Sequence, residues 1–139
     1  MKTLYLVSCV SQKLQGTHPA KELYVSSLFR KSRAYAESHA DQWYVLSAKY
    51  GLLHPESMVE SYDETLNTMD VAKRWAWAEK VSQGLSDILE PGDKVVFLAG
   101  KKYMENIVPN LQGMGVAVEN PLGTLRFGER LKWLKEHLG

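Results

Sequence analysis

The fold is decided by the stretch WYVLSAKYGLL at residues 43–53, an apolar strand followed by a polar loop. Val45 and Leu46 indicate the buried end of the strand, and Gly51 marks the turn after it. In open α/β sheets, ligands bind at the loops that follow the carboxyl ends of parallel strands. The stretch therefore predicts a ligand site at residues 47–53, which Tyr62 and Asp63 extend into the following loop.

Strand and helix patterns alternate around this stretch. Apolar, β-prone runs predict strands over residues 3–7, 42–48, 94–99 and 116–118. Helical spacing predicts helices over residues 19–38, 71–89, 101–111 and 125–138, of which the third is interrupted or closed near Pro109, and residues 49–69 form a long loop. The helix at 71–89 starts after the capping Asp70, and its predicted inward face is Val71, Trp75, Ala78, Val81, Leu85 and Ile88. The alternation predicts an α/β fold, a three-layer α/β/α sandwich with a mainly parallel sheet of about four strands, for which 2-1-3-4 is one order.

Length and composition predict one soluble domain over residues 1–139. No apolar run approaches the roughly 20 residues of a membrane span, and the first strand follows Met1 without a signal peptide. We therefore expect a cytoplasmic protein with no membrane association. The single cysteine and four histidines lack zinc-ligand spacing, so we expect no metal and no cofactor. A net charge of +1 neither supports nor excludes a polynucleotide partner.

Polar side chains at the predicted strand ends form the candidate site. We expect one concave pocket surrounded by Ser8, Lys13, Ser47, Lys49, Tyr50, Asp63, Gly100 and Tyr103. Lys13 and Lys49 would hold a phosphate, although loop lysines are often only solvated. Tyr50 or Tyr62 would stack on a base, or else would plug the loop against the sheet.

Further residues have two interpretations each. Asp63 would move a proton or hold a sugar, or would only cap a turn. Gly51 and Gly100 would allow positive φ or close approach of a ligand, or would simply turn the chain. Arg126 would cap the site from the fourth strand, or would be a surface charge. Cys9 would be a nucleophile beside Lys13, or a small buried hydrophobe, and we expect the buried role. The catalytic candidates are therefore Asp63, Lys13 and Cys9.

Several of these motifs together resemble a widespread bacterial and phage domain family. The resemblance rests on Ser8-Cys9 with Lys13, residues 20–24, the SAKYGL run at 47–52, Tyr62-Asp63 and residues 99–103. That family is distantly similar to the YaaA peroxide-stress proteins and to the archaeosine synthase domain with a Cys-x3-Lys motif. Cys9 and Lys13 keep that spacing, and Tyr24 and Ser27 keep a second one, but Ser8 replaces a proline and Arg30 a histidine. The resemblance implies an association with nucleobases or nucleic acid and a fold related to uracil-DNA glycosylase.

These observations support two functional hypotheses. The first is a nucleobase- or nucleotide-binding protein whose partner is a nucleoside, a nucleotide or an exposed base of DNA or RNA, and which acts on a glycosidic or base bond if it is an enzyme. The second is a non-catalytic DNA-binding stress-response module resembling YaaA. Both share one fold, so the fold alone does not separate them. The sequence predicts neither the exact ligand nor the oligomeric state.

Overall fold

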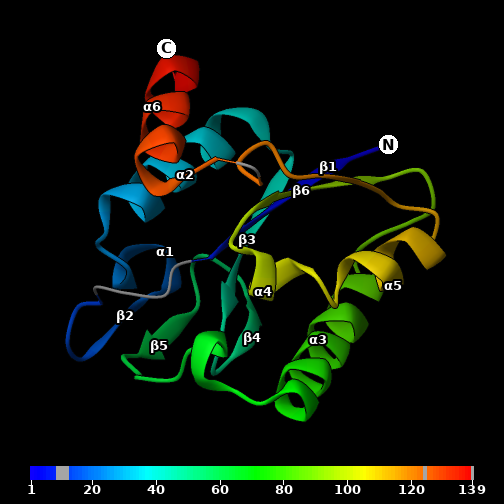
Figure 1. Ribbon diagram of the computed structural model, residues 1–139, viewed down its shortest axis with the longest axis horizontal. Helices are drawn as coiled ribbons and strands as arrows, with labels where there is room; N and C mark the ends of the chain where they lie inside the picture. The colour runs from blue at the N-terminus through cyan, green and yellow to red at the C-terminus, as the bar shows by residue number, and fades with distance from the viewer. Residues whose placement is uncertain (9–12, 124, 139) are drawn as a thin grey trace.

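The computed structural model of the protein, which describes residues 1–8, 13–123 and 125–138, contains a five-stranded sheet with helices on either side (Figure 1). The strands are β1 (Thr3–Ser8), β2 (Thr17–Pro19), β3 (Gln42–Ser47), β4 (Gly51–Leu53), β5 (Met58–Glu60), β6 (Lys94–Leu98) and β7 (Ala117–Glu119). The helices are α1 (Ala20–Leu23), α2 (Ser27–His39), α3 (Val71–Ser86), α4 (Lys101–Met104), α5 (Val108–Gly113) and α6 (Phe127–Leu138), with a short 3-10 helix η1 (Leu66–Thr68). The predicted mixed α/β fold is confirmed.

The five strands of the main sheet lie in the order β4-β3-β1-β6-β7. β3, β1, β6 and β7 are parallel to their neighbours, whereas β4 is antiparallel to β3. The register places Ser8 opposite Leu46 and Val7 opposite Leu98, so β1, β3 and β6 end at the same edge. The sheet is mainly parallel, as predicted, with β4 as an additional strand.

β1 lies in the middle of the sheet and is buried on both faces. Leu4, Leu6 and Val7 have no exposed surface. The Tyr5 ring lies 5.9 Å from that of Tyr35, so the face that carries Tyr5 is covered by α2, against which α6 packs. Figure 1 shows α3 on the other side of the strands. Such continuous burial is typical of a parallel strand covered on both faces.

A second, two-stranded sheet lies beside the main sheet. It pairs β2 with β5 in an antiparallel ribbon of three residue pairs. The N–H groups of Ala20 and Lys21 then donate to the carbonyls of Ser57 and Pro55, at 2.8 and 2.9 Å. The ribbon therefore attaches the segment after β4 to the start of α1.

The helix predicted over residues 19–38 is two helices. Tyr24 has an extended backbone and forms an isolated β-bridge with Lys13, which separates α1 from α2. Ser26 then starts α2 as its N-cap, and its hydroxyl accepts a hydrogen bond from the N–H of Phe29 at 3.1 Å. A serine in this position satisfies an N–H group that the helix leaves unpaired. The bridge and the cap together override the helical spacing.

The loop predicted over residues 49–69 contains three short elements, β4, β5 and η1. Each is three residues long, which is too short for a period of two or of 3.6 to be recognised. β4 pairs with β3, which directly precedes it, whereas β5 pairs with β2, which is distant in sequence. The position of β5 therefore depends on tertiary pairing.

The predicted inward face of α3 is partly wrong. Asp70 caps the helix as predicted, by accepting from the N–H of Lys73 at 2.8 Å. However, Trp75 is 52% exposed and Val71 is also exposed, and the predicted Ile88 lies beyond the helix, which ends at Ser86. The buried residues of the helix are Trp77, Ala78, Val81, Ser82 and Leu85. The apolar stripe is displaced because Trp77, and not Trp75, reaches the end of β3.

The helix predicted over residues 101–111, with an interruption or end near Pro109, is divided into α4 and α5. Pro109 lies in the first turn of α5. Backbone N–H groups in the first turn have no partner within the helix, so a proline there costs no helical hydrogen bond. Pro109 therefore begins the second helix. Predicted strands and helices elsewhere differ only at their ends, with β7 at Ala117–Glu119 and α6 at Phe127–Leu138.

Candidate functional site

The carboxyl ends of β1, β3 and β6 bring three of the predicted site residues to one edge of the sheet. Ser8 and Ser47 are the last residues of β1 and β3, and Gly100 follows β6 by two positions. Ser8 and Gly100 are half-buried, whereas Ser47 is fully buried. Parallel sheets bind ligands at this edge because the loops there diverge from adjacent strands.

Ser47 connects this edge to two other elements. Its carbonyl accepts a hydrogen bond from Nε1 of Trp77 at 2.8 Å, which fixes α3 against β3. Its hydroxyl oxygen accepts from the N–H of Tyr50 at 3.0 Å, which closes the turn between β3 and β4. Gly51 has a φ of 78° at the end of this turn, a conformation that favours glycine. Ser47, which is fully buried, therefore fixes the position of Tyr50.

Three tyrosines gather beyond this turn. The rings of Tyr50 and Tyr62 meet edge to face at 5.6 Å, and those of Tyr24 and Tyr62 at 6.4 Å. The hydroxyl oxygens of Tyr24 and Tyr62 are 2.5 Å apart. Tyr24 is 1% exposed and Tyr62 is 7% exposed, whereas Tyr50 is half-buried and its hydroxyl donates to the carbonyl of Glu60 at 3.2 Å. Of the three rings, that of Tyr50 is the most accessible to a ligand.

Two lysine ammonium groups flank the tyrosines. Nζ of Lys13 lies 4.6 Å from the centre of the Tyr62 ring and 6.0 Å from that of Tyr24. Nζ of Lys49 lies 5.4 Å from the centre of the Tyr50 ring. Ring faces attract cations at these distances. We call Lys13, Tyr24, Lys49, Tyr50 and Tyr62 the tyrosine–lysine cluster.

The electrostatics of the cluster favour an anionic ligand. Within residues 1–8, 13–123 and 125–138, neither Lys13 nor Lys49 forms an ion pair with a carboxylate. The tyrosine rings attract the two ammonium groups but do not neutralise their charge. The two positive charges are therefore available to a phosphate or a carboxylate.

Tyr103 lies on α4, where it contacts α3 and η1. Its buried ring meets the indole of Trp77 edge to face at 5.7 Å. Its hydroxyl oxygen accepts from the N–H of Leu66 at 3.5 Å, a long hydrogen bond that attaches η1 to α4. Tyr103 therefore supports the loop that carries Tyr62 and is almost fully buried beneath it.

Asp63 and Arg126 lie apart from these contacts. Asp63 is exposed and, among the residues described, its carboxylate forms no hydrogen bond or ion pair. It follows the buried Tyr62 directly, which brings it next to the cluster along the chain. Arg126 is exposed, its N–H donates to the carboxylate of Glu129 at the start of α6, and no contact in the described part of the chain joins it to the cluster. Cys9 lies outside the described residues.

Sequence reasoning missed two residues of this region as site residues. Tyr24 has helical spacing in the sequence, and its contact with Lys13 and Tyr62 arises only when the three segments meet. Arg74 carries a side-chain nitrogen, Nε, that is buried and has no hydrogen-bond partner in the described part of the chain. Its position three residues before Trp77 is the one signal in the sequence that could have pointed to it.

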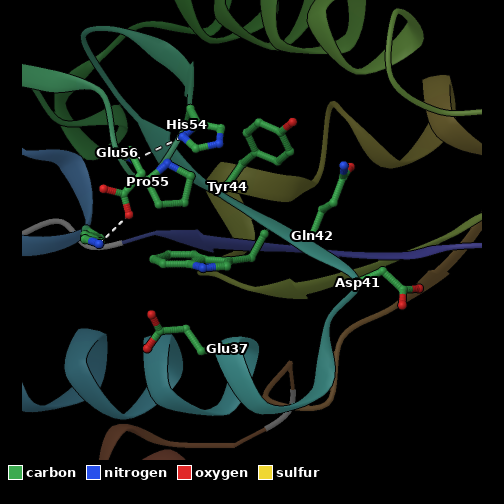
Figure 2. Close-up of a pocket in the computed structure, with 9 residues that line it drawn as sticks. Glu37, Asp41, Gln42, Tyr44, His54, Pro55 and Glu56 are labelled. Atoms are coloured by element: carbon green, nitrogen blue, oxygen red, sulfur yellow. Dashed lines mark hydrogen bonds and ion pairs between the residues drawn. The ribbon is translucent and has the colours of Figure 1, made fainter.

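A separate hollow of about 260 Å³ lies along the amino half of β3, away from the cluster (Figure 2). Its lining consists of Lys21, Glu37, Asp41, Gln42, Trp43, Tyr44, His54, Pro55 and Glu56. Glu56 is paired with Lys21, whose hydrogen bond holds the pKa of the Glu56 carboxyl below its usual value, and its N–H donates to Nδ1 of His54 at 3.1 Å. No residue of the predicted site lines this hollow.

No group of three or more histidine, cysteine, aspartate or glutamate side chains among the described residues is arranged to hold a metal ion. No helix formed by those residues has the length and apolar character needed to cross a bilayer.

Two comparisons relate the chain to known proteins. The model of DUF6884, a family of unknown function, matches residues 4–136. The chain is also similar to the uncharacterized protein YfjM of Bacillus subtilis (strain 168), with 33% identity over 117 residues. The aligned part covers 74% of this chain and 73% of YfjM. Neither description names a ligand or a reaction.

Proposed function

The chain belongs to the DUF6884 family, and we propose that it binds a nucleotide or an exposed nucleobase at the tyrosine–lysine cluster. The observation that carries this proposal is the pair of ammonium groups of Lys13 and Lys49 beside tyrosine rings, without a carboxylate partner among the described residues. Nucleotides present a flat base next to an anionic phosphate. A ring flanked by cations matches both parts of such a ligand.

Each residue has a distinct part in the proposed site. Tyr50 offers the half-exposed ring and stacks on the base. Tyr62 is buried between Tyr24 and Tyr50 and holds the stacking ring in place. Lys13 and Lys49 attract the phosphate.

The topology of the sheet supports this location. β1 lies between β3 and β6. The next parallel strand in the sequence, β3, is therefore on one side of β1, and the one after it, β6, is on the other. Ligands of open parallel sheets bind at such a switch point, outside the carboxyl ends of the strands. We propose on this basis the finer architecture, a three-layer sandwich related to uracil-DNA glycosylase. The helices on either side of the sheet in Figure 1 are in keeping with it.

If the protein is an enzyme, we propose that it acts on the glycosidic or base bond of the ligand. Asp63 is the candidate for proton transfer, because its exposed carboxylate follows Tyr62 directly and is not engaged by another described residue. Lys13 would stabilise developing negative charge. A thiol mechanism based on Cys9 is the competing hypothesis, which native thiol labelling with loss of binding would favour.

Titration calorimetry tests the proposed ligand class. The panel contains the common nucleosides, their 5′-monophosphates and short single-stranded DNA. Binding of nucleosides or monophosphates supports a nucleotide site, and binding of the oligonucleotide alone supports the alternative, a non-catalytic DNA-binding module. If a folded sample binds none of them, the proposal is wrong.

Two substitutions test the roles of Lys49 and Asp63 in the proposed site. Lys49→Ala removes one charge and is expected to weaken binding of a monophosphate by about threefold to tenfold. Lys135→Ala, at an exposed position of α6, is the matched control and should leave binding unchanged. Asp63→Asn is nearly isosteric, so it should reduce turnover far more than binding if Asp63 transfers a proton. Equal loss of both would indicate recognition without catalysis.

A further inference from the structure

Arg74 has a buried polar atom that the protein leaves unsatisfied. Its Nε is buried and makes no hydrogen bond to any described residue. The nearest carboxylate along the helix is that of Asp70, one turn earlier, which caps α3 by accepting from the N–H of Lys73. Among the described residues, no carboxylate lies within ion-pair distance of the Arg74 guanidinium. A buried donor without a partner is costly, and such groups are rare in folded proteins.

The course of α3 places Arg74 beyond the carboxyl edge of the sheet. Gly51, at the start of β4, lies beside Lys80 and Val81, and Leu52 lies beside Gly84. Because β4 is antiparallel to β3, α3 runs from the carboxyl edge toward the amino edge. Arg74 precedes Lys80 by six residues, which is about 9 Å along the axis at 1.5 Å per residue. It therefore lies past the strand ends, on the side where ligands of such sheets bind.

Arg74 lies on the face of α3 that carries Trp77. Residues three and four apart share a helix face, so Arg74 lies above Trp77 and Ala78, both buried. Trp77 donates to the carbonyl of Ser47, the residue whose hydroxyl positions Tyr50. α3 also packs against α4, which supports η1. Arg74 is thus one helical turn from the contacts that build the tyrosine–lysine cluster.

We infer that Arg74 binds the phosphate of the ligand. The inference rests on the proposed function and deepens it, because it makes a phosphate ester the recognised group. The two terminal nitrogens of the arginine guanidinium lie in one plane and match two phosphate oxygens. Lys13 and Lys49 add charge without this directional pairing. Because no carboxylate of the described residues pairs with the Arg74 guanidinium, its positive charge is left for the phosphate.

The test compares each nucleoside with its 5′-monophosphate by calorimetry, in the native protein and in three variants. Arg74→Gln removes the charge and the planar pair of nitrogens, and Arg74→Lys keeps the charge alone. Lys73→Gln removes the same charge from an exposed neighbour on the same helix and is the matched control. Thermal unfolding shows that each variant is folded.

We expect the native protein to prefer the monophosphate by about tenfold or more. Arg74→Gln should abolish this preference, Arg74→Lys should restore a minor part of it, and Lys73→Gln should keep it. An undiminished preference in Arg74→Gln would overturn the inference. Equal binding of nucleoside and monophosphate by the native protein would overturn it as well, while the nucleobase site would stand.

If the native protein binds neither ligand, the proposed function fails. A second measurement then tests whether Arg74 binds phosphate. The probe is inorganic phosphate, and the readout is the NMR resonance of the Arg74 Nε–H group. A saturable shift of that resonance supports a phosphate site at Arg74 independently of any nucleotide. An unchanged resonance up to high phosphate concentration overturns it.

Discussion

The hydroxyls of Tyr24 and Tyr62 form a buried contact of 2.5 Å between two segments that are 38 positions apart in the sequence. Tyr24 precedes α2, whereas Tyr62 belongs to the loop between β5 and η1. Because both rings are buried, this hydrogen bond is shielded from water. It fixes the loop of Tyr62 against the start of α2, and with it one wall of the tyrosine–lysine cluster.

Removing one of the two hydroxyls should therefore destabilise the protein. We expect Tyr62→Phe and Tyr24→Phe each to lower the free energy of unfolding by about 1 to 2 kcal/mol in urea titrations. The double variant should cost less than the sum of the two, since both single changes remove the same hydrogen bond. Tyr50→Phe, whose hydroxyl bonds to Glu60 at the surface, is the control and should cost less. Additive losses would show that the two hydroxyls act independently.

The two tryptophans of α3 should differ sharply. Trp77→Phe removes the hydrogen bond to the carbonyl of Ser47 from a buried site, so we expect a loss of about 1 to 3 kcal/mol in the free energy of unfolding. Trp75→Phe changes an exposed ring and should stay within about 0.5 kcal/mol of the native protein. Chemical denaturation followed by circular dichroism measures both. Similar losses in the two variants would contradict the assignment of Trp77 to the inner face.

Alanine substitutions at Gly51 and Gly100 should have different effects, the first on stability and the second on ligand binding. Gly51 has a φ of 78°, so Gly51→Ala is expected to cost about 1 to 2 kcal/mol through backbone strain, although space for a methyl group exists. Gly100 has a φ of −70° with no atom within 4 Å of an added Cβ, so Gly100→Ala should leave stability unchanged. If a ligand approaches the backbone after β6, Gly100→Ala will weaken binding in calorimetry. Retained binding would show that the ligand stays away from Gly100.

Asp93 should make stability depend on pH in the acid range. The backbone N–H groups of Lys2 and Glu90 donate to its carboxylate, both at 2.9 Å, and hold its pKa below the usual value. The carboxylate therefore stabilises the fold fully above the unfolded pKa, about 3.9, and this contribution is lost as the pH falls through the lower folded pKa.

Asp93→Asn tests this dependence, because the amide places an N–H donor against one of the two backbone donors. We expect the variant to be less stable at pH 7 and its stability to fall less steeply between pH 5 and pH 2. Asp87→Asn, an exposed position at the end of α3, serves as the control. Parallel pH profiles for the native protein and Asp93→Asn would contradict the interpretation.

The sequence predicted the main sheet well because its strands are long apolar runs. β1, β3 and β6 have five or six residues each, enough for their pattern to stand out. β4 and β5 have three each, and nothing local distinguishes them from a loop. Trp75 and Trp77 illustrate a second limit, because the choice of the buried ring depends on where β3 ends. Local pattern therefore predicts long elements, and tertiary pairing decides the short ones.

The candidate site was predicted in part. The placement of Ser8, Ser47 and Gly100 at one edge follows from the parallel arrangement, which the strand–helix alternation indicates. The contact of Lys13 with Tyr62 depends on the ribbon of β2 and β5, for which the sequence has no recognisable signal. Arg74 was missed because an arginine in a helix is ordinarily a solvated charge.

Because the ribbon of β2 and β5 is short, we expect the cluster to open more readily than the sheet beside it. Its three residue pairs, together with the bonds from Ala20 and Lys21 to the chain after β4, can open without separating any strand of the main sheet. Amide hydrogen exchange should accordingly be faster at Ala20 and Lys21 than at Leu6 in β1, with an opening free energy below that of global unfolding. Because Tyr62 follows β5 by two residues, the cluster is assembled and dismantled with this ribbon. The lifetime of the closed ribbon thus sets an upper limit on how long the cluster stays assembled.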